Sequence, residues 1–345
     1  MQTHDDFEFF CPGPVNIDNS IKKEITKLSS HRSNDFTYLI KECFHNTLKM
    51  FNVNSDYSSL FLCGSGTLSI ESIIYSYLRY KKVLLLTNGF FGERWNSMLE
   101  HYSCKFKCIN FKWNEEFDYN IIENELINKY DCLFFVHHET STTMINDINK
   151  LNEICKKTNT NIVMDSVSSV GIYNIDLMKY DMISALGFST NKCMGSYPGL
   201  CVVVIKNDIL ELMPKSPSYL NLYNYYEYIK NYQTPFTPCI QNFYAYNIIL
   251  KNKLDNTLSI ESHYDDLMNY FKKKLLEKNL LPILKNNQSN WVINIYHKHP
   301  LNIYNKLYSN KIVIYRCKKN LYDNAIQIAI YNKTKKDIDK LISLM

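Results

Sequence analysis

The stretch Gly187-Phe-Ser-Thr-Asn-Lys192-Cys-Met-Gly-Ser-Tyr-Pro-Gly-Leu200 places one lysine between two apolar runs. Residues 184–187 and residues 200–205 form these runs, and both are typical of buried strands. An ammonium group there is costly unless it is paired or loses its charge, and a lysine with a lowered pKa can bond a carbonyl carbon. The alternative is a solvated hairpin in which Lys192 faces water. The rest of the chain has to decide between these two interpretations.

The composition of the 345 residues is that of a globular protein with one large or two ordinary domains. Hydrophobic residues make up 46% of the chain, and the net charge of +5 is spread without a basic block, so we expect no nucleic-acid partner. No apolar run reaches the length of a membrane span, and the first residues lack the pattern of a signal peptide. We therefore expect a cytoplasmic protein with no membrane partner.

The 11 cysteines cannot all pair within the chain, because their number is odd. Several lie in apolar runs, which favours buried free thiols in a reducing compartment. Cys104 and Cys108 are closely spaced, but no second pair matches them. The adjacent histidines at 137 and 138 would point to opposite faces of a strand. We expect no metal site.

A glycine-containing loop, Gly64-Ser-Gly-Thr67, stands between an apolar run at 60–63 and an amphipathic pattern at 68–78. A strand, a glycine loop and a helix start in that order present backbone N–H groups to a phosphate. Ser65 and Thr67 add hydroxyl groups. The loop lacks the third glycine of a dinucleotide site and the Gly-Lys of a P-loop, so it predicts phosphate binding without naming the ligand.

Further polar residues follow other predicted strands. Asn88-Gly-Phe-Phe-Gly92 comes after the strand predicted at 82–87, and Phe91 could stack on a flat ligand or pack in the core. Asp165 ends the apolar run at 160–164, where a carboxylate needs a cationic partner unless it caps a helix. Strands and helices alternate, which predicts an open, mostly parallel α/β sheet with its ligand site at the carboxyl ends of the strands.

The last third of the chain has a different pattern. Residues 214–232 are rich in tyrosine, and we expect them to be irregular. Short strands and helices mix after residue 246, which is typical of a smaller α+β domain. We predict a large domain at residues 15–245 and a small α+β domain at residues 246–345, completed by residues 1–14.

Together these features match the needs of one cofactor, pyridoxal phosphate, which requires a Schiff-base lysine, an acidic partner, an anion cradle and an aromatic ring. The chain resembles the class V aminotransferases of PLP fold type I, with the aspartate-aminotransferase-like architecture, and within them the 2-aminoethylphosphonate:pyruvate branch. The matching segments are Cys11-Pro-Gly-Pro14, Gly64-Ser-Gly-Thr67, Asn88-Gly-Phe-Phe-Gly92, His138-Glu-Thr-Ser-Thr142, Asp165-Ser-Val-Ser-Ser169 and Ser189-Thr-Asn-Lys-Cys193.

The resemblance implies that Lys192 and Asp165 are the catalytic residues: Lys192 bonds the cofactor aldehyde, and Asp165 pairs with the protonated ring nitrogen. The other implied cofactor contacts are ring stacking by Phe91, packing of the other ring face by Val167, a bond from Thr140 to the ring hydroxyl, and phosphate binding by Ser65, Gly66, Thr67, Asn191 and, from a neighbouring subunit, Thr237. The last contact implies a homodimer with shared active sites.

The implied reaction moves an amino group from a small amine or amino acid, such as 2-aminoethylphosphonate, to a 2-oxo acid such as pyruvate by ping-pong kinetics. Some positions depart from the family. Gln327 stands where the family has an arginine that grips the acceptor's carboxylate, and an amide cannot copy a guanidinium. Arg32 or Arg316 could compensate, although a surface arginine is the simpler interpretation of Arg32. Thr143 replaces a glycine of the family and Asp147 a proline.

Other functions remain open at this point. An alanine- or serine–glyoxylate-type transaminase, or a PLP lyase or decarboxylase, would use the same fold. A desulfurase is less well supported, because no cysteine stands out in an exposed loop. A non-catalytic homologue would have no need of an intact Lys192 and Asp165, and a dinucleotide-binding protein would need a third glycine.

Overall fold

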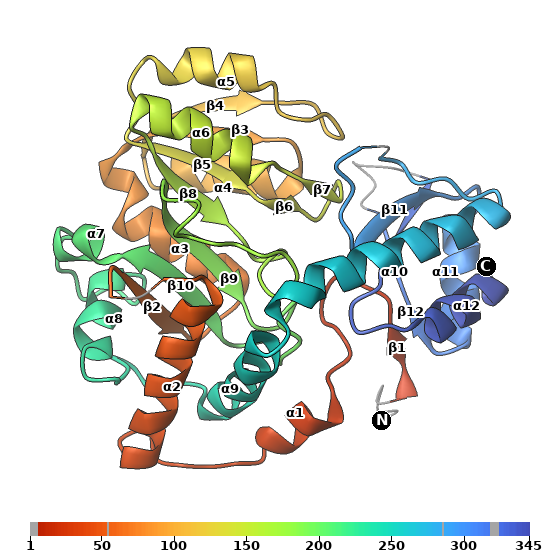
Figure 1. The fold of residues 1–345 in the computed structure, drawn as a ribbon, viewed down its shortest axis with the longest axis horizontal. Coiled ribbons are helices and arrows are strands. Elements are labelled where there is room, and N and C mark those ends of the chain that lie inside the picture. Colours follow the sequence, from red (N-terminus) through yellow and green to blue (C-terminus); the bar gives the residue numbers. More distant parts are fainter. Residues whose placement is uncertain (1–5, 54, 285, 318–323) are drawn as a thin grey trace.

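A central sheet of seven strands organises the larger part of the computed structural model, which describes residues 6–53, 55–284, 286–317 and 324–345. The strand order is β2-β10-β9-β8-β5-β3-β4. Strand β10 runs antiparallel to both of its neighbours, and the other pairs are parallel (Figure 1). The strands are β2 (Tyr57–Leu62), β3 (Lys82–Thr87), β4 (Lys105–Asn110), β5 (Cys132–Val136), β8 (Asn161–Asp165), β9 (Ile183–Ser189) and β10 (Cys201–Lys206).

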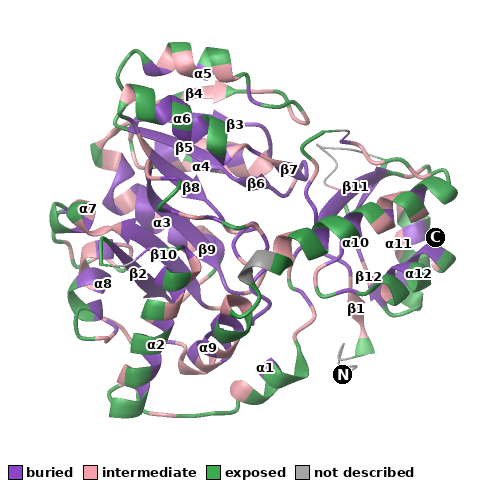
Figure 2. Ribbon diagram, in the orientation of Figure 1, coloured by how far each residue is buried: buried purple, intermediate pink, exposed green. Residues whose placement is uncertain are grey.

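Continuous apolar runs explain why these strands lie inside the molecule. All residues of β5 and β9 are buried, as expected where helices cover both faces of a sheet. Strand β4 lies at the edge, and its residues alternate between exposed and partly buried. Figure 2 shows the buried residues concentrated on the strands and the exposed ones on the outer sides of the helices.

The helices of this part pack on the sheet or on one another. Helix α3 contacts β9 and β10, α4 contacts β3, and α2 lies along α9. They are α1 (Asn19–Glu24), α2 (Asn34–Met50), α3 (Gly66–Ser76), α4 (Phe90–His101), α5 (Tyr119–Leu126), α6 (Ile148–Thr158), α7 (Asn207–Glu211), α8 (Leu222–Ile229) and α9 (Ile240–Leu254), with a 3₁₀ turn at Leu78–Tyr80.

The prediction that residues 214–232 are irregular was wrong, because α8 lies within them. The side chain of Asn221 accepts a hydrogen bond from the Tyr223 N–H and so caps the helix start. Leu222, Tyr225 and Ile229 are buried at helical spacing. Tyrosines therefore share the buried face of this helix with Leu222 and Ile229.

A second, smaller sheet has its own core. The three strands β11, β14 and β13 pair antiparallel, and Trp291, Ile328 and Phe271 are among the residues buried against them. The remaining elements are the strands β1 (Glu8–Phe9), β6 (His138–Glu139), β7 (Met144–Ile145), β11 (Val292–Tyr296), β12 (Ile312–Val313), β13 (Tyr315–Arg316) and β14 (Ala325–Ala329), and the helices α10 (Thr257–Glu277), α11 (Pro300–Ser309) and α12 (Lys335–Leu344).

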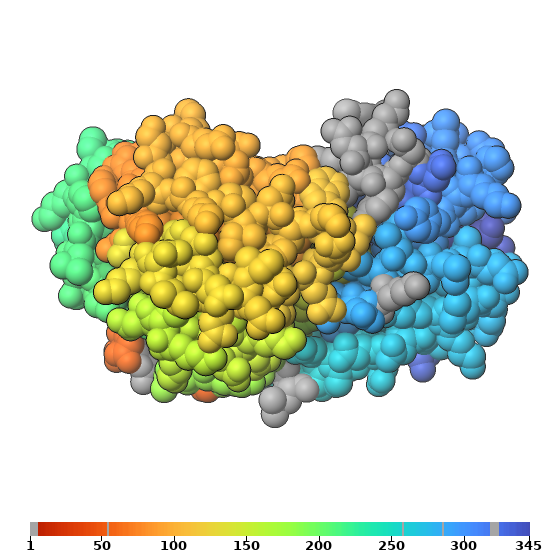
Figure 3. Space-filling view, turned by 90° about the horizontal axis from the view of Figure 1, so that it is seen from above, coloured from red at the N-terminus to blue at the C-terminus, as the bar shows by residue number. Residues whose placement is uncertain are grey.

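The two cores lie side by side in the space-filling view, where cyan and blue residues adjoin the yellow and green ones (Figure 3). Cys193, next to Lys192, belongs to the smaller core, so the lysine turn sits where the cores meet. Helix α9 passes through residue 245 without a break and packs on the larger core. The domain boundary expected at 245 and 246 stays a prediction.

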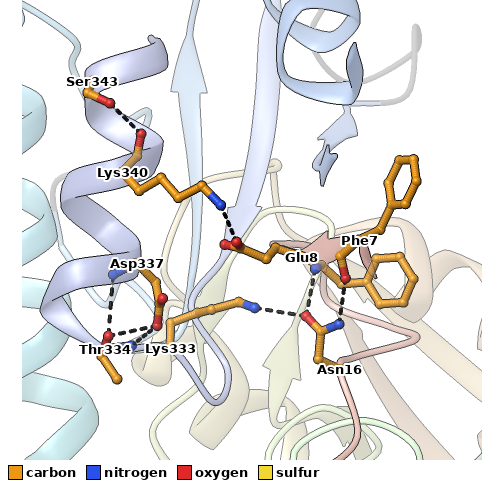
Figure 4. Close-up of polar contacts among 9 residues, drawn as sticks. Phe7, Glu8, Asn16, Lys333, Thr334, Asp337, Lys340 and Ser343 are labelled. Carbon is orange, nitrogen blue, oxygen red and sulfur yellow. Dashed lines mark hydrogen bonds and ion pairs between the residues drawn. The ribbon is translucent and has the colours of Figure 1, made fainter. Parts of the chain in front are cut away.

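The N-terminal segment is fixed to the smaller sheet. Strand β1 pairs parallel with β12. Asn16 donates to the Phe7 carbonyl at 2.8 Å and accepts from the buried ammonium of Lys333 at 2.8 Å (Figure 4). Glu8 pairs with Lys340 of α12 in the same network. These contacts hold the segment that passes Lys192.

In the described residues, we find no helix whose length and apolar character would let it cross a membrane.

Candidate active site

The carboxyl ends of five strands with the same direction meet at one edge of the large sheet, and the predicted site residues gather there. Residues 64–67 follow β2, Phe91 follows β3 and Thr140 follows β5. Asp165 ends β8, and Lys192 follows β9. The common direction of these strands thus brings together side chains that are far apart in the sequence.

Lys192 lies in the turn between β9 and β10, as predicted. Its side chain passes Gly13, where an added Cβ would lie 3.5 Å from the lysine Cε. Its Nζ lies 5.7 Å from the centre of the Phe91 ring. Removal from water lowers the pKa of Lys192, while the nearby Cys193 and Asp165 oppose that shift. A larger fraction of neutral amine is the result.

Asp165 is 3% exposed and accepts two hydrogen bonds. The indole Nε1 of Trp95 donates to Oδ2 at 2.8 Å, and the Val167 N–H donates to Oδ1 at 2.9 Å. Burial nevertheless raises the pKa of Asp165 to about 6, although these donors and the positive charges of Lys192 and Arg94 lower it. A cation placed against this carboxylate would favour its ionised form.

The start of α3 contains the loop that the sequence predicts to bind an anion. Ser65 is the N-cap residue, and the first N–H groups of a helix have no partner inside it. An added Cβ at Gly66 would lie 2.7 Å from Val167 Cγ1, so only glycine lets the loop pack this closely. The guanidinium of Arg94 donates to Thr67 Oγ1 at 3.3 Å. Helix N-terminus and guanidinium together favour a phosphate-sized anion.

Phe91 is held by a buried carboxylate at the start of α4. The side chain of Glu139 accepts from the N–H groups of Phe91 and Gly92, both at 3.1 Å, and from the Ser141 N–H at 3.2 Å. Arg94 lies over the Phe91 ring, 5.1 Å from its centre. The backbone that carries the predicted stacking ring is therefore tied to β6.

His138 and Gln327 of β14 lie beside Ser168 and Thr140, respectively. His138 Nδ1 lies 2.8 Å from the Ser168 carbonyl, and burial lowers the pKa of His138 to about 3. Its Nε2 has no hydrogen-bond partner among the described residues. Gln327 is buried and donates to the Thr140 carbonyl at 2.8 Å and to Asn294 Oδ1 at 2.9 Å.

One pocket is lined by six of the ten residues predicted to bind the cofactor. Its lining includes Thr67, Phe91, Thr140, Asp165, Val167 and Lys192 of the predicted set, and Arg94, Trp95, Val136, His138 and Ser168 in addition. Ser65, Gly66 and Asn191 adjoin these residues in the chain. Arg94 and Trp95 were not predicted from the sequence. They stand three and four positions after Phe91, so their side chains lie on the same face of α4 as Phe91.

Four predicted residues lie elsewhere or face another way. Thr237 is exposed in the segment before α9. Arg32 is exposed and donates to Gln233 at 3.4 Å, and the exposed Arg316 lies over the Tyr304 ring. Both amide hydrogens of Gln327 are already used. In the described chain, no cluster of three or more His, Cys, Asp or Glu side chains is arranged to hold a metal.

The pocket fits the cofactor that the sequence predicts. Lys192 and Asp165 offer an amine and a carboxylate in the same lining, and Gly66 lets the start of α3 pack closely against Val167, which also lines the pocket. His138 Nε2 supplies a buried polar atom that is still to be satisfied. These groups are those that pyridoxal phosphate requires.

Comparisons with known proteins agree with this chemistry. A model of the family described as Aminotransferase class-V matches residues 19–322. An uncharacterized aminotransferase of Methanocaldococcus jannaschii is 28% identical over 251 residues, which cover 69% of this chain and 64% of that protein. A 2-aminoethylphosphonate–pyruvate transaminase of Bacteroides fragilis is 26% identical over 204 residues, covering 58% and 56% respectively. The chain thus spans less than two thirds of the length of these relatives.

The fold is shared with a solved structure. An aspartate aminotransferase of Thermus thermophilus has a TM-score of 0.89 to this chain at 19% identity, covering 98% of this chain and 97% of that one. This likeness confirms the predicted fold class, an α/β protein of fold type I.

Proposed function

This chain belongs to the class V aminotransferases, and on that basis we propose that it moves an amino group from a small amine to a 2-oxo acid with the help of pyridoxal phosphate. The observation that carries the proposal is the meeting of Lys192 and Asp165 in one pocket, beside the start of α3 and the Phe91 ring. A solvated hairpin would leave the lysine in water, and the lowered pKa of Lys192 argues against that.

The residues divide the work by their chemistry. Bound pyridoxal phosphate supplies an aldehyde for the amino group and an aromatic ring that withdraws electrons. Asp165, held by Trp95 and the Val167 N–H, keeps a positive charge on the ring nitrogen. Lys192 Nζ takes the proton from the substrate carbon that bears nitrogen and later returns a proton. Its lowered pKa favours the neutral amine needed for the first of these transfers.

Other residues position the cofactor. Phe91 and Val167 are proposed to hold the two faces of the ring, and Thr140 its hydroxyl. The phosphate is assigned to Ser65, Gly66, Thr67 and Asn191, with Arg94 close enough to Thr67 to add charge. We also propose that Thr237, exposed in a single chain, reaches the phosphate of a second subunit in a homodimer. Sedimentation should then give twice the chain mass of 40.8 kDa.

For the donor we propose 2-aminoethylphosphonate, with pyruvate as acceptor. The Asn191-Lys192-Cys193 segment and the name of the Bacteroides relative support this choice. Gln327, whose amide hydrogens are used, offers no cation to an α-carboxylate, so the carboxylate of pyruvate needs another partner. A donor without an α-carboxylate needs no cation at this position. We propose that Arg94, Arg32 or Arg316 binds the acceptor's carboxylate.

A donor and acceptor screen tests the proposal. Purified protein loaded with pyridoxal phosphate is given 2-aminoethylphosphonate, alanine or serine, each with pyruvate, with glyoxylate or with no acceptor. We expect alanine to form from 2-aminoethylphosphonate and pyruvate, and Lys192→Ala to abolish this. Lys105→Ala, which removes an exposed lysine on β4, should leave the rate unchanged.

Three outcomes would redirect the assignment. Turnover only with glyoxylate as acceptor would indicate an alanine– or serine–glyoxylate-type transaminase. Product formation that needs no acceptor would indicate a lyase or decarboxylase. Absence of turnover together with absence of cofactor binding would support a non-catalytic homologue.

A further inference from the structure

Two cysteines that the proposed reaction does not use lie side by side behind the phosphate loop. Cys63 follows β2 and directly precedes Gly64, and Cys239 is the N-cap residue of α9, 176 positions later. Their sulfur atoms are 3.5 Å apart. We propose that Cys63 and Cys239 form a reversible disulfide on reaction with a low-molecular-weight disulfide such as oxidised glutathione.

The surroundings make Cys63 the attacking thiol. The Cys239 N–H donates to Cys63 Sγ at 3.1 Å. The Cys239 thiol, the Cys239 N–H and Tyr219 together lower the pKa of Cys63 to about 7 in spite of burial. The same contact raises the pKa of Cys239. Both sulfurs lie in partly exposed residues, which a small oxidant can reach.

Other cysteines in the described chain lack these features. Cys201 is adjacent on β10 but fully buried, and burial raises its pKa. Cys104 and Cys108 are partly exposed like Cys63, yet burial raises the pKa of each. The pair is therefore distinguished by sulfur distance and by a backbone donor, which single exposed thiols do not have.

The chemistry balances in two exchange steps. The Cys63 thiolate attacks one sulfur of the oxidant, whose S–S bond breaks and releases one thiolate. Cys239 then attacks Cys63 Sγ, the mixed disulfide breaks, and the second thiolate leaves. The two thiol protons end on the two released thiols, and the oxidant takes up two electrons. The sulfurs need to approach from 3.5 Å to about 2.05 Å for the bond to form.

A disulfide between Cys63 and Cys239 would affect the phosphate loop that begins at Gly64. The Gly199 carbonyl, at the exit of the lysine turn, accepts from the Gly64 N–H at 3.0 Å and from the Cys239 thiol at 3.1 Å. Oxidation removes the second donor and ties the start of α9 to the residue before Gly64. Thr237 lies two positions before Cys239. We therefore expect the oxidised protein to hold pyridoxal phosphate more weakly, a consequence that rests on the proposed function, whereas the disulfide itself does not.

The experiment uses purified protein with its cofactor in buffers of increasing oxidised-to-reduced glutathione ratio. Free thiols are blocked at acidic pH, the protein is digested without reduction, and peptides are mapped by mass. We expect a cross-linked peptide pair containing Cys63 and Cys239, lighter than the sum of its parts by two hydrogen atoms and removed by dithiothreitol. Equilibrium dialysis of the oxidised protein should give a several-fold higher Kd for the cofactor, reversed by the same reductant.

Matched variants separate the possibilities. Cys239→Ser should give a glutathione adduct on Cys63 and no cross-link, whereas Cys104→Ser should form the cross-link as the wild type does. If Cys104 is modified while Cys63 and Cys239 remain unlinked thiols, the proposal is overturned. If the cross-link forms and cofactor affinity is unchanged, the coupling to the phosphate loop is wrong. If the reduced protein binds no cofactor, the proposed function fails, and the peptide map still decides on the disulfide.

Discussion

The pocket contains two ionisable side chains, and removal from water shifts the pKa of each. Burial raises the pKa of Asp165 to about 6 and lowers that of Lys192, while the attraction between the two opposes both shifts. Trp95 and the Val167 N–H satisfy the carboxylate but do not cancel the effect of burial. Residues of this kind are common at functional sites, because a bound ligand can relieve the strain on their charges.

The raised pKa of Asp165 predicts a pH dependence of stability in cofactor-free protein. Between pH 4 and 6 the folded chain binds a proton at Asp165 that the unfolded chain has released, so the free energy of unfolding falls as pH rises through this window. Denaturant titrations of wild type and Asp165→Asn at several pH values isolate this contribution, because other groups cancel in the difference. The stability of the wild type relative to the variant should drop by up to ~3 kcal/mol. A difference that stays flat would show that Asp165 ionises normally, and one that rises would show that folding lowers its pKa; either result contradicts the prediction.

Single positions also show what the sequence could reveal. Lys192, Asp165, Phe91 and Thr67 were found because each follows a predicted strand and the strands point the same way. Trp95 was missed because no helix was predicted after Phe91, whereas in α4 it stands one turn further along. The hydrogen bonds of Gln327 to Thr140 and Asn294 could not be predicted from the sequence. They depend on how the smaller sheet folds and on where it lies relative to Thr140.

At the scale of elements, the site depends on how helix starts are fixed to the sheet. Glu139 of β6 binds the N–H groups at the start of α4, and α3 begins in close contact with Val167. The motif containing Glu139 was recognised in the sequence, but its partner helix was not. Helix α8 was missed because its tyrosines were taken as irregular, although Asn221 and the spacing of the buried residues marked it.

Glu139→Gln should weaken the attachment of α4. The amide has one oxygen, so its NH₂ group must face N–H donors on one side and leave them unsatisfied while buried. We expect a loss of ~1–3 kcal/mol in the free energy of unfolding by urea titration. Glu100→Gln, on the exposed side of the same helix, should change it by less than ~0.5 kcal/mol. Equal effects of the two substitutions would contradict the role given to Glu139.

Gly66→Ala should be destabilising although alanine normally favours a helix. The added methyl would lie 2.7 Å from Val167 Cγ1, and the overpacking should cost ~1–3 kcal/mol. The double variant Gly66→Ala with Val167→Ala removes the clash, so a double-mutant cycle by thermal or urea unfolding should show strong coupling. Additive effects would mean that the α3 start is not packed against Val167.

At the scale of the whole molecule, the active-site edge lies between two cores, and the N-terminal segment joins them. Residues near the start of the chain pair with β12, and Asn16 bonds to Lys333 just before α12 (Figure 4). Gly13, between these two contacts, borders Lys192. The sequence predicted that residues 1–14 complete the smaller unit, and the pairing of β1 with β12 is consistent with that prediction. The boundary expected at residues 245 and 246 stays a prediction, and α9 is continuous across these two residues.

Asn16→Ala tests this connection. The Asn16 side chain accepts from Phe9 N–H and Lys333 and donates to the Phe7 carbonyl, so its loss leaves the buried ammonium of Lys333 without this acceptor. We expect ~1–3 kcal/mol of destabilisation in urea and weaker cofactor retention, since Gly13 borders Lys192. Asn120→Ala, at an exposed position of α5, is the control. Matching behaviour of the two variants would show that the N-terminal segment is not fixed by Asn16.

The central claim is that the amine of Lys192 bonds the aldehyde of pyridoxal phosphate, and trapping that bond tests it most directly. Protein incubated with the cofactor is reduced with borohydride, digested and mapped by mass spectrometry, with Lys192→Ala treated in parallel. The account predicts a reduced cofactor adduct on the peptide that contains Lys192 in wild type and no site-specific adduct in the variant. An adduct at another lysine, or no adduct at all, would contradict it.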